Sequence, residues 1–260
     1  MRKVLLLFSI LICICTSGYN QIIKGTVLDQ NTNSPIDNAL VYFNGTSVGT
    51  YADKDGHFEL DISKNISMPL TISALGYNSE TVTDFLKVRP LLVHLTPHVF
   101  ELKEVVIAGK NNPQARQTNL ALFKREFLGA TQNAMRCEIT NENDISLIYD
   151  SKDETLRAFS SKPIIIDNKA LGYKIFYYLN KFEFCRTNYQ LTLLGNYIFK
   201  EEPTSNKIMQ QRFERKRIIT YLGSRMHFFR TLWQNNLDSA GFTVKDSVNV
   251  RLSYDKLVAQ

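Results

Sequence analysis

Histidine is the side chain best suited to hold a catalytic metal ion in this 260-residue chain. A hydrolytic zinc site needs two imidazoles and a carboxylate on the metal, together with a general base. The chain has four histidines, which are His57, His94, His98 and His227. Pro97 lies between His94 and His98 and disfavours the helix that would bring those two onto one face. We interpret them as surface histidines and expect no metal site.

A second candidate for chemistry is Asp53-Lys54-Asp55-Gly56, which begins like a calcium-binding loop. A complete loop ends in a glutamate that holds the ion with both oxygens, and Glu59 comes too early for this role. A tight turn with a positive φ at Gly56 is the favoured interpretation. Ser34, Ser73 and Ser224 do not lie in a Gly-x-Ser-x-Gly elbow, and the chain has no phosphate-binding glycine loop and no dinucleotide fingerprint. We expect no cofactor and no enzymatic activity; the alternative is an enzyme with a dispersed site in the C-terminal half.

Residues 1–21 have the pattern of a targeting segment. Arg2 and Lys3 precede an apolar run from Val4 to Cys15, and the small residues that follow suit cleavage after Gly18. The run is shorter than the roughly 20 residues of a spanning helix, so a retained anchor is only the alternative. A lipoprotein signal with Cys15 as the lipidated cysteine is another alternative, but such signals have a small residue before the cysteine and this chain has the bulky Ile14. We expect an exported protein.

Export implies an oxidising compartment, so the cysteines of the mature chain decide the redox chemistry. Cys13 and Cys15 leave with the targeting segment, and Cys137 and Cys185 remain. These two form either one disulfide or two separate buried thiols. The mature chain has no Cys-x-x-Cys, which argues against a zinc ribbon or thioredoxin-like chemistry.

Basic side chains gather in the C-terminal half. Residues 22–110 carry 7 Lys and Arg against 10 Asp and Glu, whereas residues 111–260 carry 22 against 15. One cluster is flanked by aromatics and consists of Arg212, Arg215, Lys216, Arg217, Arg225 and Arg230. It reads either as a face that binds lipid headgroups or an acidic glycan, or as a solvated helix face with its aromatics packed inward, which we favour. For an exported protein we expect an anionic membrane surface or glycan before nucleic acid.

Aromatic side chains in the same half suggest a second kind of binding. Tyr173, Tyr177 and Trp233 can stack on sugar rings, which would make the protein a carbohydrate-binding accessory. Packing in a sheet core or pairing across strands is the favoured interpretation of the tyrosines.

Short alternating segments separated by turn residues fill residues 22–97. Phe58, Leu60 and Ile62 alternate with polar residues, which is the period of a strand with one buried face. Asn44-Gly45 and Asp55-Gly56 are turn signals. Strands are predicted at 22–29, 39–43, 48–51, 58–62, 69–74, 77–82 and 91–95. Seven short strands without a helix predict an all-β antiparallel sandwich.

The order and spacing of these motifs resemble the carboxypeptidase regulatory-like domain. The residues that carry the resemblance are Lys24-Gly25-Thr26-Val27, Pro35-Ile36-Asp37-Asn38-Ala39, Asn44-Gly45-Thr46, Gly49-Thr50, Asp53 to Phe58, and Ser73-Ala74-Leu75-Gly76-Tyr77. The resemblance covers residues 22–97 and implies a transthyretin-like sandwich, as found at the N-terminus of TonB-dependent receptors and in other Gram-negative envelope proteins. It also implies a non-catalytic binding or presenting module, located in the periplasm or at the outer membrane, whose partner is an envelope protein or glycan.

The remainder of the chain is predicted to be a linker over 98–117 and a basic α+β domain over 118–260. Thr118 can cap a helix whose apolar stripe includes Phe123 and Phe127 and which Gly129 ends. Strands are predicted at 145–149, 155–159, 164–166, 173–179, 189–199 and 242–250, with helices at 206–222 and from Ser224 to just before Gly241. Phe127-Leu128-Gly129, Asn168 to Tyr173 and Gly223 to Phe228 resemble an uncharacterised extension found beside the regulatory-like domain in some exported proteins.

Overall fold

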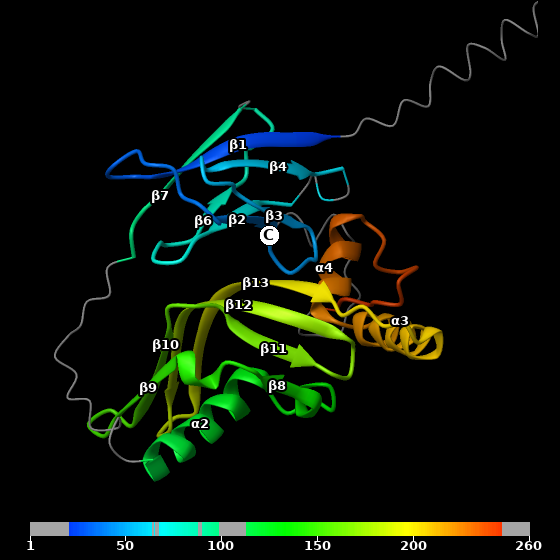
Figure 1. Cartoon of the computed structure of the whole chain (residues 1–260). Helices are drawn as coiled ribbons and strands as arrows, with labels where there is room; N and C mark the ends of the chain where they lie inside the picture. The colour runs from blue at the N-terminus through cyan, green and yellow to red at the C-terminus, as the bar shows by residue number, and fades with distance from the viewer. Residues whose placement is uncertain (1–20, 64, 66–67, 88–89, 99–112, 246–260) are drawn as a thin grey trace, which may run out of the picture.

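The computed structural model describes residues 21–63, 65, 68–87, 90–98 and 113–245, which form two parts (Figure 1). Strands alone build the N-terminal part, whereas the C-terminal part combines a curved sheet with helices. The predicted targeting segment lies outside the described residues, apart from its last residue. Within the described residues, no helix is both long enough and apolar enough to cross a bilayer.

Seven strands in the N-terminal part form two sheets that face each other. One sheet has the order β4-β1-β7 and the other has the order β3-β2-β5-β6. The bounds are β1 Ile22–Asp29, β2 Leu40–Phe43, β3 Gly49–Tyr51, β4 His57–Asp61, β5 Leu70–Ser73, β6 Glu80–Val82 and β7 Leu91–Leu95. The predicted all-β sandwich is confirmed, but the prediction that it is antiparallel is wrong for one pair, because β1 and β7 run parallel. The sixth strand is shorter than predicted, because Gly76 has φ +82° and turns the chain just before Tyr77.

The core of the sandwich comes from the inward positions of the alternating strands. Ile23 and Val27 of β1 are fully buried and pack with Phe43 and Phe85 between the sheets. β2 differs from β1 in being buried at all four positions. Strands buried on both faces carry apolar side chains at every position. The outer face of β2 is therefore covered as well, and the C-terminal part provides that cover.

The turn before β4 has the tight geometry that its sequence predicts. Gly56 has φ +73°, and a Cβ on it would lie 2.5 Å from the carbonyl oxygen of Val27. The Asp53 side chain accepts hydrogen bonds from the backbone N–H groups of Asp55 at 2.9 Å and His57 at 2.8 Å. The aspartate therefore organises backbone, and only glycine fits the close approach.

Six antiparallel strands form the sheet of the C-terminal part, with the order β8-β11-β12-β10-β9 and β13 on the remaining edge of β12. The bounds are β8 Cys137–Ile139, β9 Ile145–Asp150, β10 Thr155–Ser160, β11 Ile164–Asn168, β12 Tyr173–Cys185 and β13 Gln190–Glu201. β13 pairs with the whole length of β12 on one edge. On the other edge of β12, β11 pairs with its first half and β10 with its last residues. The register shifts between Leu179 and Lys181, and such an irregularity increases the local twist. The sequence did not predict the three-residue β8.

The first described helix of this part, α2 (Pro113–Leu128), covers one face of the curved sheet. Phe123 is fully buried and meets Phe182 edge-on, with ring centroids 4.8 Å apart. Phe127 contacts Tyr177 in the same manner at 4.9 Å. The predicted stripe is confirmed, but the predicted start at Thr118 and the linker end at 117 are wrong. Pro113 occupies the first helical position, where its missing N–H costs nothing.

The two parts meet where the β2–β3 turn lies on the edge of β13. The backbone N–H of Gly45 donates to the Tyr197 oxygen at 2.9 Å, and that of Phe199 donates to the Thr46 oxygen at 3.1 Å. The Asn44 side chain donates to Asn196 at 3.0 Å and accepts from the Tyr197 N–H at 2.9 Å. The turn therefore covers part of the outer edge of β13, which would otherwise be an unpaired strand edge. Beneath the turn, an interface cluster comprises Leu40, Tyr42, Phe176, Tyr178 and Ile198.

Two further helices follow the sheet, α3 (Lys207–Tyr221) and α4 (Arg225–Trp233). The predicted helix over 206–222 is confirmed, with Asn206 and Leu222 as its caps. The predicted extension of the second helix towards Gly241 is wrong, because Asn235 takes a φ of +51° just after Trp233 and ends it. The predicted strand over 242–250 is not formed at residues 242–244, and its part from residue 246 lies outside the described residues. Two 3-10 turns, Ala134–Arg136 and Glu142–Asp144, complete the part.

Candidate functional site

The inner side of α3 is fixed to the sheet. Asn206 caps the helix by accepting from the N–H groups of Ile208 at 3.0 Å and Met209 at 3.1 Å. Phe213 lies so close to Gly172 that a Cβ on the glycine would be 2.5 Å from its ring. The helix therefore seats against the loop that precedes β12, and its opposite side is turned outward.

Arg217 provides the polar part of this attachment. Its guanidinium donates to the carbonyl oxygens of Leu171 at 2.8 Å and Gly172 at 2.9 Å, and pairs with Glu201 at 2.7 Å. It also lies over the Tyr173 ring, 4.0 Å from the centroid. Only 15 % of its side chain is exposed. Arg217 belongs to the predicted anionic-partner face, but here it anchors the helix.

The outward side of α3 mixes aliphatic and cationic side chains. Ile208 is 79 % exposed, and Ile218, Ile219 and Leu222 are exposed as well. Exposed Arg212 and Arg215 stand among them without an ion-pair partner in the described part of the chain. Lys216 is half-buried towards one side. Aliphatic side chains on the solvent side of a firmly attached helix are characteristic of an interaction surface.

α4 repeats this arrangement. Ser224 caps it by accepting from the His227 N–H at 3.2 Å, and buried His227 accepts from the Gly223 N–H at 3.1 Å. Buried Thr231 donates to the His227 oxygen at 2.9 Å. The side facing away from this polar network is exposed and carries Arg225, Met226, Phe229, Arg230 and Trp233.

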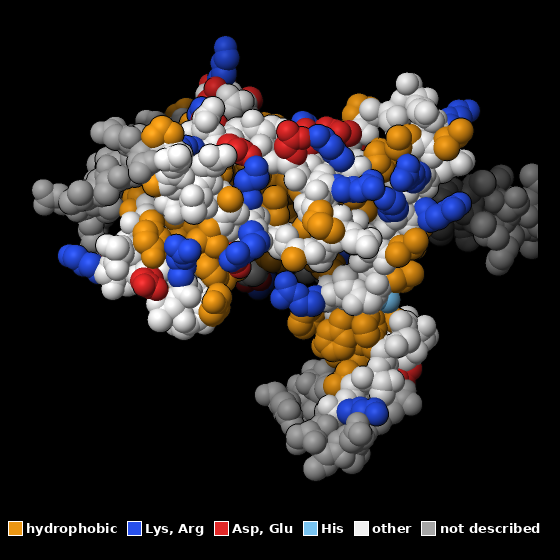
Figure 2. Space-filling view, turned by 90° about the horizontal axis from the view of Figure 1, so that it is seen from below, with side chains coloured by type: hydrophobic (Ala, Val, Ile, Leu, Met, Phe, Trp, Pro, Cys, Tyr) orange, Lys and Arg blue, Asp and Glu red, His pale blue; other side chains and the backbone are white. Residues whose placement is uncertain are grey.

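Together the two helices present one class of surface, which we call the α3–α4 face. Residues 207–233 contain seven Lys and Arg and a single carboxylate, Glu214. Figure 2 shows Lys and Arg side chains gathered, with hydrophobic ones among them, on the side of the molecule where α3 lies in Figure 1. The α3–α4 face comprises Ile208, Arg212, Arg215, Ile218, Ile219, Leu222, Arg225, Met226, Phe229, Arg230 and Trp233.

Of the predicted basic cluster, Arg212, Arg215, Arg225 and Arg230 lie on this face. Arg230 is also within 5.6 Å of the Tyr221 ring. The sequence reasoning missed the aliphatic members and expected the aromatics to pack inward. Phe213 does so, whereas Trp233 is 80 % exposed. The signal was available: positions 208, 212, 215, 219 and 222 follow helical spacings of three and four and share one side.

The tyrosines predicted to stack on sugars lie on β12 and pack within the fold, whereas Trp233 is the last residue of α4. Tyr173 lies under Arg217 and meets Phe199 at 4.7 Å between centroids. Tyr177 packs against Phe127 and stacks on Tyr197, and burial raises its pKa to about 12. Both rings therefore already have aromatic or cationic neighbours within the fold.

The four histidines lie on separate elements and do not converge. His57 shares a hydrogen bond of 2.9 Å with Thr26, His98 is bonded to Asn78, and His227 belongs to the α4 cap. His94 is half-buried on β7. In the described residues, no group of three or more His, Cys, Asp or Glu side chains is placed to hold a metal ion.

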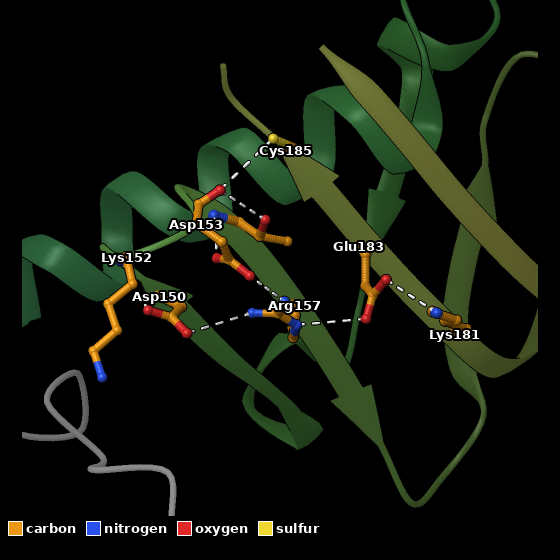
Figure 3. A network of polar contacts seen from close by, with 8 residues as sticks. Asp150, Lys152, Asp153, Arg157, Lys181, Glu183 and Cys185 are labelled. Carbon is orange, nitrogen blue, oxygen red and sulfur yellow. Dashed lines mark hydrogen bonds and ion pairs between the residues drawn. The ribbon is translucent and has the colours of Figure 1, made fainter. Parts of the chain in front are cut away.

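Acidic side chains do gather beside β10, where they surround a cation (Figure 3). Arg157 pairs with Asp153, with Asp150 at 3.9 Å and with Glu183 at 3.4 Å. Lys181 pairs with Glu183 at 3.0 Å. The hydrogen bond from Arg157 is the main cause that lowers the pKa of Asp153. This network ties β10 to its neighbours through ion pairs.

Both described cysteines are free thiols, so the disulfide alternative is wrong. In the sheet, Cys137 of β8 pairs with Asn168 of β11, and Asn168 pairs in turn with Tyr173. Cys137 is therefore level with the first residue of β12, whereas Cys185 is the last residue of that strand. Twelve residues of strand separate those positions by about 40 Å, far beyond the reach of a disulfide. Burial raises the pKa of Cys137, whereas hydrogen bonds from the backbone of Asn188 and Thr187 lower that of Cys185.

Comparison with known proteins identifies the N-terminal part. Residues 23–107 match the model of the CarboxypepD_reg-like domain. No curated protein matches the chain. A domain of this kind fits a non-catalytic binding or presenting module. The N-terminal sandwich of this chain therefore belongs to the CarboxypepD_reg-like domain family.

Proposed function

We propose that this chain is a non-catalytic, exported module of a Gram-negative envelope. It binds an anionic partner through the α3–α4 face, and this binding holds the N-terminal sandwich beside the partner. The observation that carries the proposal is the exposure of apolar and cationic side chains on α3, which Arg217 fixes to the sheet, and on α4, which follows it. Burial of such apolar side chains favours association, and the arginines select the sign of the partner.

The contacts between the two parts support a presenting role. The β2–β3 turn is joined to β13 by backbone and side-chain hydrogen bonds, and α3 is joined to the start of β12 by Arg217. A partner held by the helices is therefore held at a fixed place relative to the sandwich. The envelope setting of the proposal rests on the predicted targeting segment and on the resemblance of residues 22–97 to the regulatory-like domains of envelope proteins.

The ionisable side chains that lie close together in the fold are bonded to one another or to the backbone, which supports a role without catalysis. Arg157 is ion-paired with three carboxylates, and His227 is occupied by the cap of α4. These groups stabilise the fold. A purified mature protein that hydrolyses peptides or glycans, and loses the activity on substitution of one residue, would contradict this part of the proposal.

The binding role is tested by site-specific photo-crosslinking in cells. A photoreactive amino acid replaces Phe229 on the α3–α4 face or, as the matched control, Tyr189, an exposed aromatic residue between β12 and β13. We expect position 229, and not position 189, to crosslink to a component of the envelope fraction. Equal labelling from both positions, or none from position 229, would overturn the proposal.

A further inference from the structure

We infer that the partner of the α3–α4 face is the surface of an anionic phospholipid bilayer, on which the two helices lie without spanning it. This inference rests on the proposed function, because it identifies the partner of the same face.

The first argument is the interleaving of two kinds of side chain. Along α3, Ile208, Arg212, Arg215, Ile219 and Leu222 follow one another at helical spacings on the outward side. A partner has to accept a guanidinium and an aliphatic group at adjacent positions along the helix. The boundary between lipid headgroups and acyl chains offers phosphate and hydrocarbon within about 5–10 Å of depth.

The second argument is the aromatic content of α4. Trp233 and Phe229 are exposed next to Met226, with Arg225 and Arg230 on either side. Tryptophan favours the headgroup region of a membrane, where its ring is in an apolar setting and its N–H stays near water. Nucleic acid would satisfy the arginines but would leave the aliphatic side chains of α3 in water.

The third argument is charge and placement. The helical segment 207–233 carries a net charge of +6 from seven cations and one carboxylate. Figure 1 shows α3 at one side of the molecule, beyond the arrowhead of β13. The attraction to anionic lipid is worth roughly 1 kcal/mol for each cation near the surface, which is about a fivefold change in partitioning.

The chain carries its own probe for this interaction. Trp233 is the only tryptophan of the 260 residues, and it lies on the α3–α4 face. We expect its emission to shift to the blue when the full mature chain is titrated with vesicles containing about one third phosphatidylglycerol. Brominated acyl chains should quench it. The shift should be absent with purely zwitterionic vesicles and should weaken as salt is added, because salt screens exposed charges.

Paired variants separate this face from general charge. Arg212→Gln with Arg215→Gln should weaken partitioning about 25-fold, from two steps of about fivefold. Lys54→Gln with Lys152→Gln removes the same charge from exposed positions outside the helices and should leave partitioning unchanged. A Phe229→Ser variant tests the apolar contribution and should also weaken binding. Circular dichroism on each variant checks that the fold is retained.

The outcomes distinguish this inference from the proposal on which it rests. A blue shift whose lipid dependence the arginine pair weakens and the lysine pair leaves unchanged supports a lipid surface. An unchanged emission with every vesicle, or equal losses in both pairs, overturns it. If position 229 crosslinks to an acidic protein or glycan while vesicles fail, the lipid partner is wrong and the binding module stands; if both fail, both are wrong.

Discussion

Asn44 is the residue whose removal most directly tests how the two parts are joined. Its side chain donates to Asn196 at 3.0 Å and accepts from the Tyr197 N–H at 2.9 Å, and both acceptor and donor belong to β13. Asn44→Ala removes both hydrogen bonds at once. It leaves the backbone bonds of Gly45 and Thr46 in place.

The expected loss follows from these two bonds. A hydrogen bond contributes about 1 kcal/mol net, and a half-buried N–H left without an acceptor costs a similar amount or more. We therefore expect Asn44→Ala to lower the free energy of unfolding by about 2 kcal/mol. Asn196→Ala removes only one of the bonds and should cost about 1 kcal/mol. Because the two residues interact, the double variant should fall short of the sum by about 0.5–1.5 kcal/mol.

The assay is urea denaturation followed by far-ultraviolet circular dichroism. Asn31→Ala is the matched control, since Asn31 is an exposed asparagine of the sandwich away from β13. In thermal scans the loss corresponds to a decrease of roughly 4–8 °C in Tm. If Asn44→Ala unfolds within about 0.5 kcal/mol of the control, the turn does not join the parts as described.

Two further predictions concern the seat of α3 and the interface core. Gly172→Ala places a Cβ against Phe213 at a φ of +64° and should cost about 2–4 kcal/mol, whereas Gly129→Ala, at φ +80° with open space around it, should cost about 1–2 kcal/mol; equal losses in denaturation would refute the clash. Burial raises the pKa of Tyr42 to about 12, so its stabilising contribution is complete below pH 10, the unfolded value, and is lost as pH rises towards 12. Tyr42→Phe should therefore reduce the alkaline loss of stability by up to about 2–3 kcal/mol, while Tyr189→Phe should not; parallel pH profiles for both variants would contradict this.

Local patterns in the sequence were sufficient for most elements. Alternation along Phe58, Leu60 and Ile62, the Asp-Gly turn and the caps at Asn206 and Ser224 act over a few residues, so strands and helices appear where expected. Errors arose at ends. Two residues in the chain could start α2, Pro113 and Thr118, and the helix starts at Pro113. Two could end α4, Asn235 and Gly241, and the positive φ of Asn235 ends it first.

The candidate site divides in the same way. The cluster of arginines was visible in the sequence, and so was the helical spacing of Ile208, Arg212 and Arg215. Which of them bind a partner was not visible. Arg217 lies in the same run, yet it points inward because it donates to the carbonyl groups of Leu171 and Gly172, which lie 46 and 45 residues earlier. The choice between anchor and free cation depends on contacts that are remote in sequence.

The sequence by itself determined the sandwich, its glycine turns and the excess of positive charge in the C-terminal half, because these follow from short-range periodicity, backbone freedom at glycine and composition. The tertiary structure decided that the β2–β3 turn closes the edge of β13, that Cys137 and Cys185 stay apart, and that Ile208, Ile219 and Trp233 are exposed while Phe213 and Tyr173 are not. Burial is settled by what packs against each side chain, and here the packing partners come from distant parts of the chain.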